Sequence, residues 1–476
     1  MLFNTLEYAV FLPLSFALYW LCAPHRKARL SLLLGLSYVF YAFWDPRFLP
    51  LLFASSSVDW WLAHRIANTE EPAQRKRLLA VTLCLNLGVL AVFKYLGFGV
   101  ESARSVFLAL GFDPPALALE IALPIGISFF TFESMSYVID VYRKQLEPHE
   151  SYLEYLCFVA FFPHLVAGPI VRPRDLLPQL ARPPRFTNAA GSRGLFLIAV
   201  GLLKKVAIGD YLALNLVDRV FDAPLQYSSL ECYAAVVGYA VQIYCDFSGY
   251  TDIAIGSALL FGIRFPQNFD SPYKAANVQD FWRRWHISLS TWLRDYLYVS
   301  LGGNRRGEAR TYVNLMLTML LGGLWHGASW NFVLWGGLHG GALCVTRAFG
   351  ARRGTEEATR GGQQRLFLQV ASTVATFHFV CFAWIFFRSE SFSDAGLILD
   401  RLGQLSFHRG NLPATVVAVL GVGLASHFFP ERWFTILRVR LLRGPVAVQG
   451  MLLFGVAWIV RNMSGADAVP FVYFQF

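Results

Sequence analysis

Apolar stretches long enough to cross a lipid bilayer recur along this chain and limit its fold more than any other feature. A helix needs about 20 mostly apolar residues to span the hydrocarbon core. Such runs occupy 6–22, 30–44, 48–63, 78–97, 117–140, 195–219, 230–262, 312–348, 366–388, 412–429 and 449–462. The runs 230–262 and 312–348 exceed one crossing, so each is either a bent helix or a hairpin. We therefore predict an all-α polytopic integral membrane protein with about 11 spanning helices.

The composition agrees with a membrane protein. Hydrophobic residues make up 55% of the 476 residues and charged residues only 15%, whereas soluble proteins carry about 25% charged residues. A soluble particle of this size could not bury so much apolar surface, and disordered, fibrous and disulfide-rich classes are excluded as well. The seven cysteines are scattered without a Cys-x-x-Cys pair. We expect buried free thiols, with no disulfide frame and no metal site.

Basic residues predict the orientation in the membrane. The net charge is +10, and Lys and Arg gather in short runs beside the apolar spans. If the N-terminus is outside, the basic loops 24–29, 64–77 and 142–150 all face the cytoplasm, while 45–47 and 98–116 carry few Lys or Arg. This alternation follows the positive-inside rule and indicates lipid headgroups, with no nucleic acid, as the partner of the basic residues.

We expect residues 1–476 to form a single membrane domain. Residues 1–150 would hold the N-terminal spans, 151–350 a core with re-entrant elements, and 351–476 the C-terminal spans. The run 6–22 has no basic leader and no small-residue cleavage site, so we interpret it as a retained first span.

Two segments break the spanning pattern. The apolar segment 152–171 is interrupted by Pro163, Gly168 and Pro169 and has basic loops on both sides, which predicts a re-entrant element. The polar region 264–310 contains Phe281 to Tyr298, whose aromatic and basic residues predict one amphipathic helix at the membrane interface. That helix is either an interfacial anchor or part of a site. Residues 351–365 are predicted to be a polar cytoplasmic loop.

His326 is the strongest candidate functional residue, because it lies deep in an apolar run. Ionisable groups at membrane depth are costly and usually face a cavity. Glycines at 322, 323 and 327 leave room beside it for a substrate. The alternative is a neutral histidine that bonds a carbonyl of a neighbouring helix.

Two further positions leave alternatives open. On the predicted helix, His286 shares a face with Trp282, Arg283 and Ser290, and it is either functional or a plain interfacial residue. Asp246 and Ser248 place an acid and a hydroxyl in an apolar span. They either line a tunnel and orient a catalytic histidine, or they cap a helix break.

Several motifs together resemble the membrane-bound O-acyltransferase family, and in particular its polysaccharide-acetylating branch. The two most specific are FWRRWHISLSTWLRDYLYVSLGGNR at 281–305 and GGLWHGASWNFVLWGGLHG at 322–340. The others are LPIGISFFTFESMSYVIDVYR at 123–143, FFPHLVAGPIVR at 161–172, GLLKKVAIGDYLA at 201–213, DFSGYTDIAIG at 246–256, WIFFR at 384–388 and YFQF at 473–476. The sequence after about residue 390 matches the family's sequence pattern only loosely.

The resemblance implies a site and a function. His326 matches the family's catalytic histidine, and His286 matches a second, commonly essential one. The family fold is a bowl of spanning, re-entrant and interfacial helices around a central tunnel. It implies O-acetylation of an exported polysaccharide, alginate or a similar one, at the bacterial inner membrane, with the N-terminus periplasmic. The donor would be cytoplasmic acetyl-coenzyme A or another acyl thioester, with no permanently bound cofactor. The partner would be a periplasmic SGNH-type acetyltransferase or a related polysaccharide-modification protein.

The residues fit this chemistry. A buried neutral histidine can take a proton from the attacking hydroxyl. Trp325, Asn331 or backbone N–H groups could stabilise the oxyanion, and sequence does not choose among them. The pairs Arg283 with Arg284 and Lys204 with Lys205 either bind the phosphates of the donor or contact headgroups, and Trp282 and Trp285 would stand beside them at the tunnel mouth.

The sequence leaves three alternatives to acetylation of an exported polysaccharide. D-alanyl transfer to teichoic acid and acetylation of peptidoglycan would use the same core. A non-catalytic transporter of the acyl donor would use His326, Asp246 and Glu133 as a proton relay, but it predicts inverted repeats, which the sequence does not display. The third alternative is a non-catalytic scaffold for a biosynthetic complex.

Overall fold

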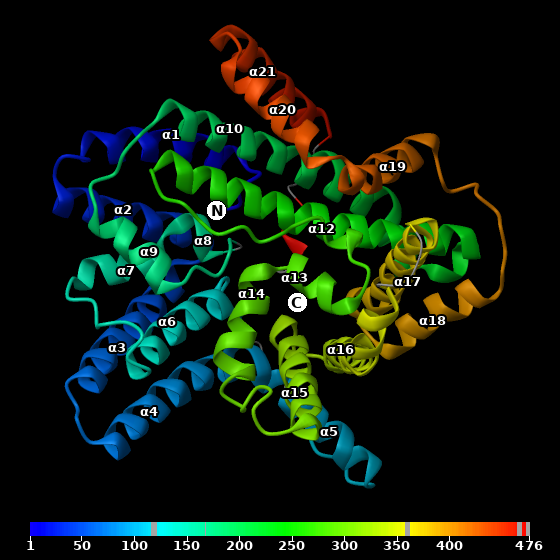
Figure 1. Cartoon of the computed structure of the whole chain (residues 1–476), viewed down its shortest axis with the longest axis horizontal. Coiled ribbons are helices and arrows are strands. Elements are labelled where there is room, and N and C mark those ends of the chain that lie inside the picture. Colours follow the sequence, from blue (N-terminus) through cyan, green and yellow to red (C-terminus); the bar gives the residue numbers. More distant parts are fainter. Residues whose placement is uncertain (116–120, 167, 358–361, 464–468, 473–476) are drawn as a thin grey trace. The chain divides into compact units, whose positions relative to one another are not determined.

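The computed structural model describes residues 1–115, 121–166, 168–357, 362–463 and 469–472 (Figure 1). Every regular element in these ranges is a helix, which confirms the all-α prediction. The chain divides into two compact units. The first comprises Met1–Gly194 with Ala254–Pro266, and the second comprises Leu195–Ile253 with Gln267–Phe476.

The first unit is built around a helix that is buried on all sides. Its elements are α1 (Leu6–Leu21), α2 (Arg26–Ala42), η1 (Pro46–Phe48), α3 (Leu49–Ala67), α4 (Pro72–Leu90), η2 (Ala91–Tyr95), α5 (Leu96–Ala109), α6 (Ile127–Tyr142), α7 (Tyr152–Ala160), α8 (Phe162–Leu165), α9 (Pro173–Ala181) and the start of α10 (Asn188–Leu202). Side chains from Ile127 to Val141 of α6 are all buried, and α6 packs against α3 and α4.

Polar groups inside this unit satisfy one another. The Asp59 carboxylate accepts hydrogen bonds from Asn86 at 2.8 Å and from the Ser134 hydroxyl, which in turn lies 2.8 Å from the Tyr155 hydroxyl. Such a network joins α3, α4, α6 and α7 in a setting where an unpartnered polar group would cost about 1–3 kcal/mol. Asp59 therefore links α3 to α4 and α6 through hydrogen bonds.

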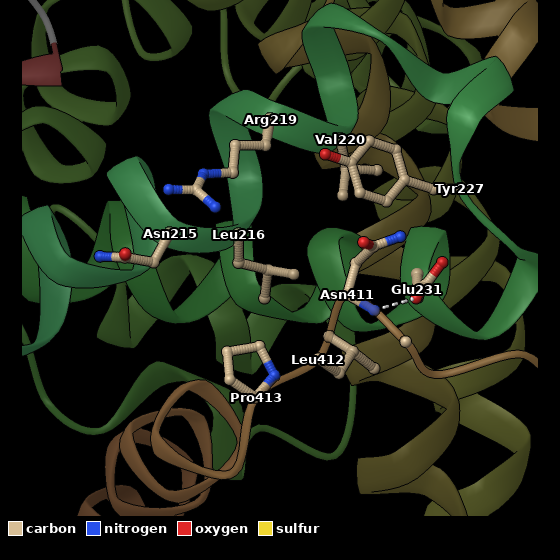
Figure 2. A pocket seen from close by; sticks show the side chains of 10 residues that line it. Asn215, Leu216, Arg219, Val220, Tyr227, Glu231, Asn411, Leu412 and Pro413 are labelled. Carbon is tan, nitrogen blue, oxygen red and sulfur yellow. Dashed lines mark hydrogen bonds between the residues drawn. The ribbon is translucent and has the colours of Figure 1, made fainter.

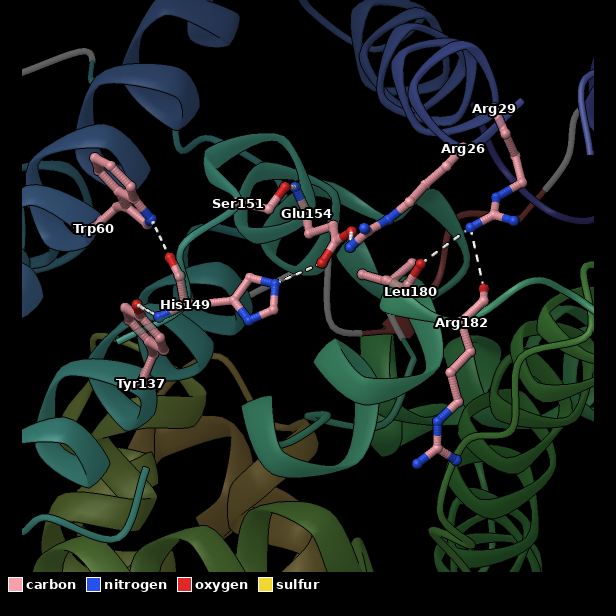
Figure 3. Close-up of polar contacts among 9 residues, drawn as sticks. All are labelled: Arg26, Arg29, Trp60, Tyr137, His149, Ser151, Glu154, Leu180 and Arg182. Atoms are coloured by element: carbon pink, nitrogen blue, oxygen red, sulfur yellow. Dashed lines mark hydrogen bonds and ion pairs between the residues drawn. The ribbon is translucent and has the colours of Figure 1, made fainter. Parts of the chain in front are cut away.

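Figure 3 shows that basic residues of two predicted cytoplasmic loops are fixed to the protein. The buried Glu154 carboxylate pairs with Arg26 and with His149 at 2.6 Å. Trp60 donates to the His149 carbonyl at 2.9 Å, and Arg29 donates to the Leu180 carbonyl at 3.1 Å. These basic side chains therefore hold the two loops to neighbouring helices, in addition to any contact with lipid headgroups.

The segment 152–171 is interrupted as predicted. It forms two short buried helices, α7 and α8, which are separated at Phe161. His164 of α8 places Nδ1 2.9 Å from the buried Glu133 carboxylate, which also accepts from the Val171 N–H at 3.0 Å. The backbone is thus buried in protein, as membrane depth would require. Entry and exit on one membrane face stay a prediction.

The second unit contains the sequence motifs richest in histidine. Its elements are the rest of α10, η3 (Leu203–Asp210), η4 (Ala213–Val217), α11 (Asp218–Asp222), η5 (Pro224–Gln226), α12 (Ser229–Leu260) as far as Ile253, η6 (Pro272–Lys274), α13 (Val278–Arg284), α14 (Ile287–Trp292), η7 (Leu293–Tyr298), α15 (Glu308–His326), α16 (Trp330–Glu357), α17 (Gly362–Arg388), α18 (Phe392–Gly403), α19 (Ala414–Phe428), α20 (Glu431–Arg443) and α21 (Val446–Met463). The end of α12, from Ala254, belongs to the first unit. The long run 230–262 is the single helix α12.

The run 312–348 is a hairpin of α15 and α16, and glycines allow its close packing. A Cβ on Gly323 would overlap the Phe332 carbonyl oxygen, and a Cβ on Gly336 would overlap the Met319 carbonyl oxygen. Only glycine lets the two backbones approach so closely. The hairpin therefore fixes the end of α15 through backbone contact.

Two predictions for single segments are wrong. Phe281 to Tyr298 is not one amphipathic helix, because α13 ends before Trp285 and α14 begins after His286, where the backbone turns left-handed at φ 42°. The segment 351–365 is not a simple loop, since α16 continues to Glu357 and α17 starts at Gly362. The motif at 473–476 lies outside the described residues.

Among the described residues, two long helical stretches are apolar enough to cross a membrane by length and composition, Pro72–Ala109 (α4, η2 and α5) and Gln363–Arg388. Shorter apolar helices cover Leu6–Leu21, Ala414–Phe428 and Ala447–Met463. The number of spanning helices, about 11, stays a prediction.

Candidate active site

His326 is the last residue of α15 and is 3% exposed. Its ring lies in an aromatic enclosure, with ring centroids 5.1 Å from Trp335 of α16 and 5.4 Å from Phe387 of α17. The helix ends here because Gly327 is extended and packs so tightly on the Phe332 ring that a Cβ would overlap it. The imidazole is therefore held by packing at a helix end.

His286 lies at the break between α13 and α14 and is completely buried. Its ring is 4.6 Å from Phe247 and 6.1 Å from Trp325, and Trp325 is also 5.0 Å from the His326 ring. Trp325 thus contacts both histidines, so the two family-matched residues share one site. Burial lowers the pKa of His286, in the turn between α13 and α14, to about 3 and keeps its imidazole neutral.

Two buried residues of this site carried no assigned role in the sequence analysis. His339 of α16 accepts a hydrogen bond from the Trp282 indole N–H at 3.3 Å, and its ring is 4.7 Å from Trp335. Asn268 places Oδ1 3.2 Å from Nδ1 of His286. The spacing of four residues between Trp335 and His339 could have indicated a shared helix face. No local signal marks Asn268, whose contact with His286 spans 18 residues.

A basic cavity of about 810 Å³ lies on one side of the aromatic enclosure. Trp282 and Arg283 line it, and Arg294 and Arg347 add two further guanidinium groups. Its other lining residues are Gln279, Ile287, Ser290, Thr291, Leu293, Tyr298, Asn304, Leu315, Thr318, Met319, Leu343 and Thr346. Because the Trp282 ring is 5.7 Å from Trp335, which contacts His326, this "basic cavity" approaches the site through aromatic rings.

Arg284 does not line the basic cavity. Its guanidinium pairs with Asp280 at 3.0 Å and with Asp270 at 3.4 Å. The prediction that Arg283 and Arg284 act together on a donor is therefore corrected. Consecutive residues point in different directions, and acidic partners neutralise the second arginine.

A second cavity of about 620 Å³ is acidic and adjoins the turn after His326. Its lining consists of Asp218, Asp222, Ala328, Ser329, Phe332, Phe387, Arg388, Ser389 and Glu390. Arg388 pairs with Asp218 at 2.9 Å, so three carboxylates face one cation in this "acidic cavity". Phe387 lines the cavity and touches the His326 ring, which makes it the partition between them.

Lys204, Lys205 and Asp246 have structural partners. Lys204 pairs with Asp252 at 2.7 Å, and Lys205 pairs with Asp246 and with Asp210 at 2.7 Å. Asp246 also accepts from the Val472 backbone N–H at 2.7 Å. Both lysines are thus paired with carboxylates. Asp246 pairs with Lys205 and accepts from Val472, which corrects the prediction that Asp246 orients a histidine or caps a helix break.

The remaining candidate residues, Asn331, Trp285 and Ser248, are all buried. Asn331 donates to the Ser389 carbonyl at 2.7 Å and thereby ties α16 to the end of α17. Trp285 is buried, 5.2 Å from the Trp384 ring. Ser248 is buried within the continuous helix α12 and lines neither cavity. In the described residues, no group of three or more His, Cys, Asp or Glu could hold a metal ion.

A third, smaller cavity of about 280 Å³ adjoins the start of α12 (Figure 2). Glu231 accepts from the backbone N–H of Asn411 at 2.8 Å and of Ser228 at 2.9 Å. Arg219 and Tyr227 also line this cavity. Glu231 therefore anchors the segment around Asn411 to α12.

Comparison with known proteins places this geometry in a family. A sequence profile described as MBOAT, membrane-bound O-acyltransferase family, matches residues 77–388. The chain is 38% identical to the probable alginate O-acetylase AlgI of Pseudomonas putida over 98% of both chains. It is 42% identical to the protein of that name from Pseudomonas aeruginosa, over 89% of this chain and 80% of the relative. It is 38% identical to the peptidoglycan O-acetyltransferase of Helicobacter pylori, over 85% and 80%.

Teichoic acid D-alanyltransferase of Bacillus subtilis is more distant, at 28% identity over 56% of this chain. The profile spans well over half of the residues and includes His286 and His326. The chain therefore belongs to the membrane-bound O-acyltransferase family and is an acyltransferase.

Proposed function

We propose that this enzyme moves acetyl groups from a cytoplasmic thioester across the inner membrane for O-acetylation of an exported polysaccharide. The observation that carries the proposal is the position of His326, enclosed by aromatic rings between a basic cavity and an acidic cavity. Relatives named for acetyl transfer align over 81–98% of this chain, against 47–56% for those named for D-alanyl transfer. The coverage favours acetyl transfer.

The basic cavity would take the donor. Phosphate groups of acetyl-coenzyme A or of a carrier-bound pantetheine need cationic partners, and guanidinium forms the strongest charge-assisted bonds to phosphate. Arg283 and Arg347 make no ion pair within the described residues, whereas Arg294 pairs with Asp295 at 2.7 Å. Arg283 is the best placed, because it follows Trp282, whose ring is 5.7 Å from Trp335. The acyl end would point toward Trp335 and His326.

His326 would act as the general base. It takes the proton of the acceptor hydroxyl while the oxygen attacks the thioester carbonyl, and a tetrahedral oxyanion forms. Collapse breaks the carbon–sulfur bond, the proton passes from His326 to the departing thiolate, and the products are an ester and a thiol. Aromatic walls exclude water, which would otherwise compete as acceptor.

The acidic cavity would receive the acceptor. Three carboxylates against one arginine repel a polyuronate such as alginate, so direct contact with that polymer is disfavoured. A hydroxyl presented by a separate periplasmic acetyltransferase, for example one of SGNH type, suits this charge better. We therefore propose a protein intermediate between this enzyme and the polymer, with the chain in the inner membrane and its N-terminus in the periplasm.

Mass spectrometry of the exported polymer and of peptidoglycan, with and without this chain, tests the proposal. Loss of acetyl groups from the exported polysaccharide alone is expected. Loss from peptidoglycan alone would assign the cell wall as the substrate. Loss of D-alanine esters from teichoic acid, measured in the same cells, would show D-alanyl transfer instead of acetyl transfer.

A further inference from the structure

The side-chain carbonyl of Asn268 is a hydrogen-bonding centre beside His286. Oδ1 accepts from the Ser288 backbone N–H at 3.1 Å and from the Ser288 hydroxyl at 2.9 Å, and it lies 3.2 Å from Nδ1 of His286. The side chains of Asn268 and His286 are at most 1% exposed. Every contact in this cluster lies within the second unit.

The orientation of the Asn268 amide is fixed by its surroundings. If its oxygen and nitrogen were exchanged, the NH₂ group would face the Ser288 backbone N–H, and two donors would oppose each other. The Ile287 N–H also donates to the Asn268 backbone carbonyl at 2.9 Å, which fixes the segment against the turn at His286. The carbonyl oxygen therefore faces the imidazole.

This orientation determines the tautomer of His286. An amide oxygen can only accept, so Nδ1 must carry the proton. The Ser288 hydroxyl has one proton and directs it to Asn268 at 2.9 Å, whereas its distance to Nδ1 is 3.5 Å. A neutral imidazole has a single N–H, so Nε2 carries a lone pair.

We propose that Asn268 is a positioning residue that holds His286 in the Nδ1–H tautomer, so that Nε2 acts as a hydrogen-bond acceptor during acyl transfer. The proposal rests on the proposed function and deepens it. It divides the roles in the site, because a neutral His286 in this tautomer cannot donate from Nε2 to the oxyanion. His286 instead accepts from the incoming hydroxyl and aligns it for His326.

Two substitutions of matched size isolate the acceptor atom. Asn268→Asp keeps an oxygen beside Nδ1 and adds a negative charge, which favours the imidazolium form. Asn268→Leu removes the acceptor. Thr251→Val is the control, because Thr251 is the partner of the other end of the amide, at 3.5 Å from Nδ2. Detergent-solubilised membranes, supplied with the periplasmic partner and the polymer, would be given radiolabelled acetyl-coenzyme A, and label in the partner and in the polymer would be measured from pH 4 to 9.

Asn268→Leu should lower kcat about 10- to 100-fold with less than about a threefold change in the donor KM, because tautomer control affects only the chemical step. Asn268→Asp should retain activity at high pH, while its acid-side loss of activity moves up by about 1 pH unit or more. Thr251→Val should match the wild-type enzyme.

If Asn268 had a purely structural role, its substitution would lower the amount of active enzyme and leave the pH profile unchanged. Coincident pH profiles for Asn268→Asp and the wild-type enzyme would therefore overturn the role of Asn268 and leave the proposed function intact. Wild-type membranes that transfer no label would overturn the proposed function, and this proposal with it.

Discussion

At His326, the role of general base can be separated from a role in packing. His326→Gln keeps the size of the side chain and some hydrogen bonding inside the ring enclosure, but it cannot carry a proton at neutral pH. Acetylation should fall about 10²- to 10⁴-fold, the usual loss when a general base is removed. Acetyl content of the exported polymer would be measured by mass spectrometry in cells that lack the native gene.

The comparison needs equal membrane levels of each variant, verified by immunoblot. His326→Ala should be equally inactive and should still insert, since the hairpin contact at Gly323 and Gly336 does not involve the imidazole. Near-normal acetylation with His326→Gln would assign His326 to a structural role.

Two neighbouring arginines provide a matched pair for donor binding. Arg283 lines the basic cavity, whereas Arg284 is paired with Asp280 and Asp270. Arg283→Ala should raise the KM for acetyl-coenzyme A by about tenfold with little change in kcat, because a phosphate contact made in both ground and transition state is uniform binding. Arg284→Ala should change the KM by less than about twofold.

Steady-state rates with solubilised enzyme would measure both effects. The reverse order, with Arg284→Ala the weaker binder, would exclude the basic cavity as the donor site.

The placement of residues was predictable from sequence where a motif was specific, and it was not predictable where a partner far along the chain determines the contact. His326 and His286 are buried together, as the motifs indicated. Lys205 and Asp246, by contrast, neutralise each other across 41 positions of sequence, and no local pattern displays that pairing. Charge beside an apolar span therefore indicated a ligand where the fold supplies an ion pair.

At the scale of elements, the α15–α16 hairpin depends on glycine. Gly323→Ala would force the Phe332 carbonyl away and should lower stability by about 1–3 kcal/mol, the usual cost of overpacking. Because His326 lies three residues further along α15, the site should shift and activity should fall by at least about tenfold. Thermal unfolding in detergent and polymer acetylation would be measured together.

Gly341→Ala is the control, since a Cβ at Gly341 meets no atom within 4 Å. Alanine is favoured over glycine inside a helix by about 1 kcal/mol, so this variant should be as stable as the native protein or more so. Equal stability of the two variants would mean that the hairpin tolerates separation.

The helices were easier to predict than the break between α13 and α14. Hydrophobic spacing runs without interruption through Phe281 to Tyr298, so one continuous helix was the natural expectation. The left-handed backbone at His286 is held by hydrogen bonds that Ile287 and Ser288 donate to Asn268, and such tertiary bonds override a local period.

At the scale of the whole molecule, orientation in the membrane can be tested with introduced cysteines. Asp113 and Gln145 are exposed in loops predicted to face opposite sides. In a chain with the exposed Cys84 replaced by serine, Asp113→Cys should react with an impermeant maleimide in spheroplasts, and Gln145→Cys should react only after lysis. The opposite pattern would invert the topology and exchange the proposed donor and acceptor sides.

The basic and acidic cavities have no lining residue in common. With the donor and the acceptor in the cavities proposed for them, both can be bound at the same time, and neither has to leave before the other enters. This separation implies a sequential kinetic mechanism, with initial-rate plots that intersect instead of running parallel. The thiol product should compete with the acyl donor and not with the acceptor, because it leaves through the mouth by which the donor came in.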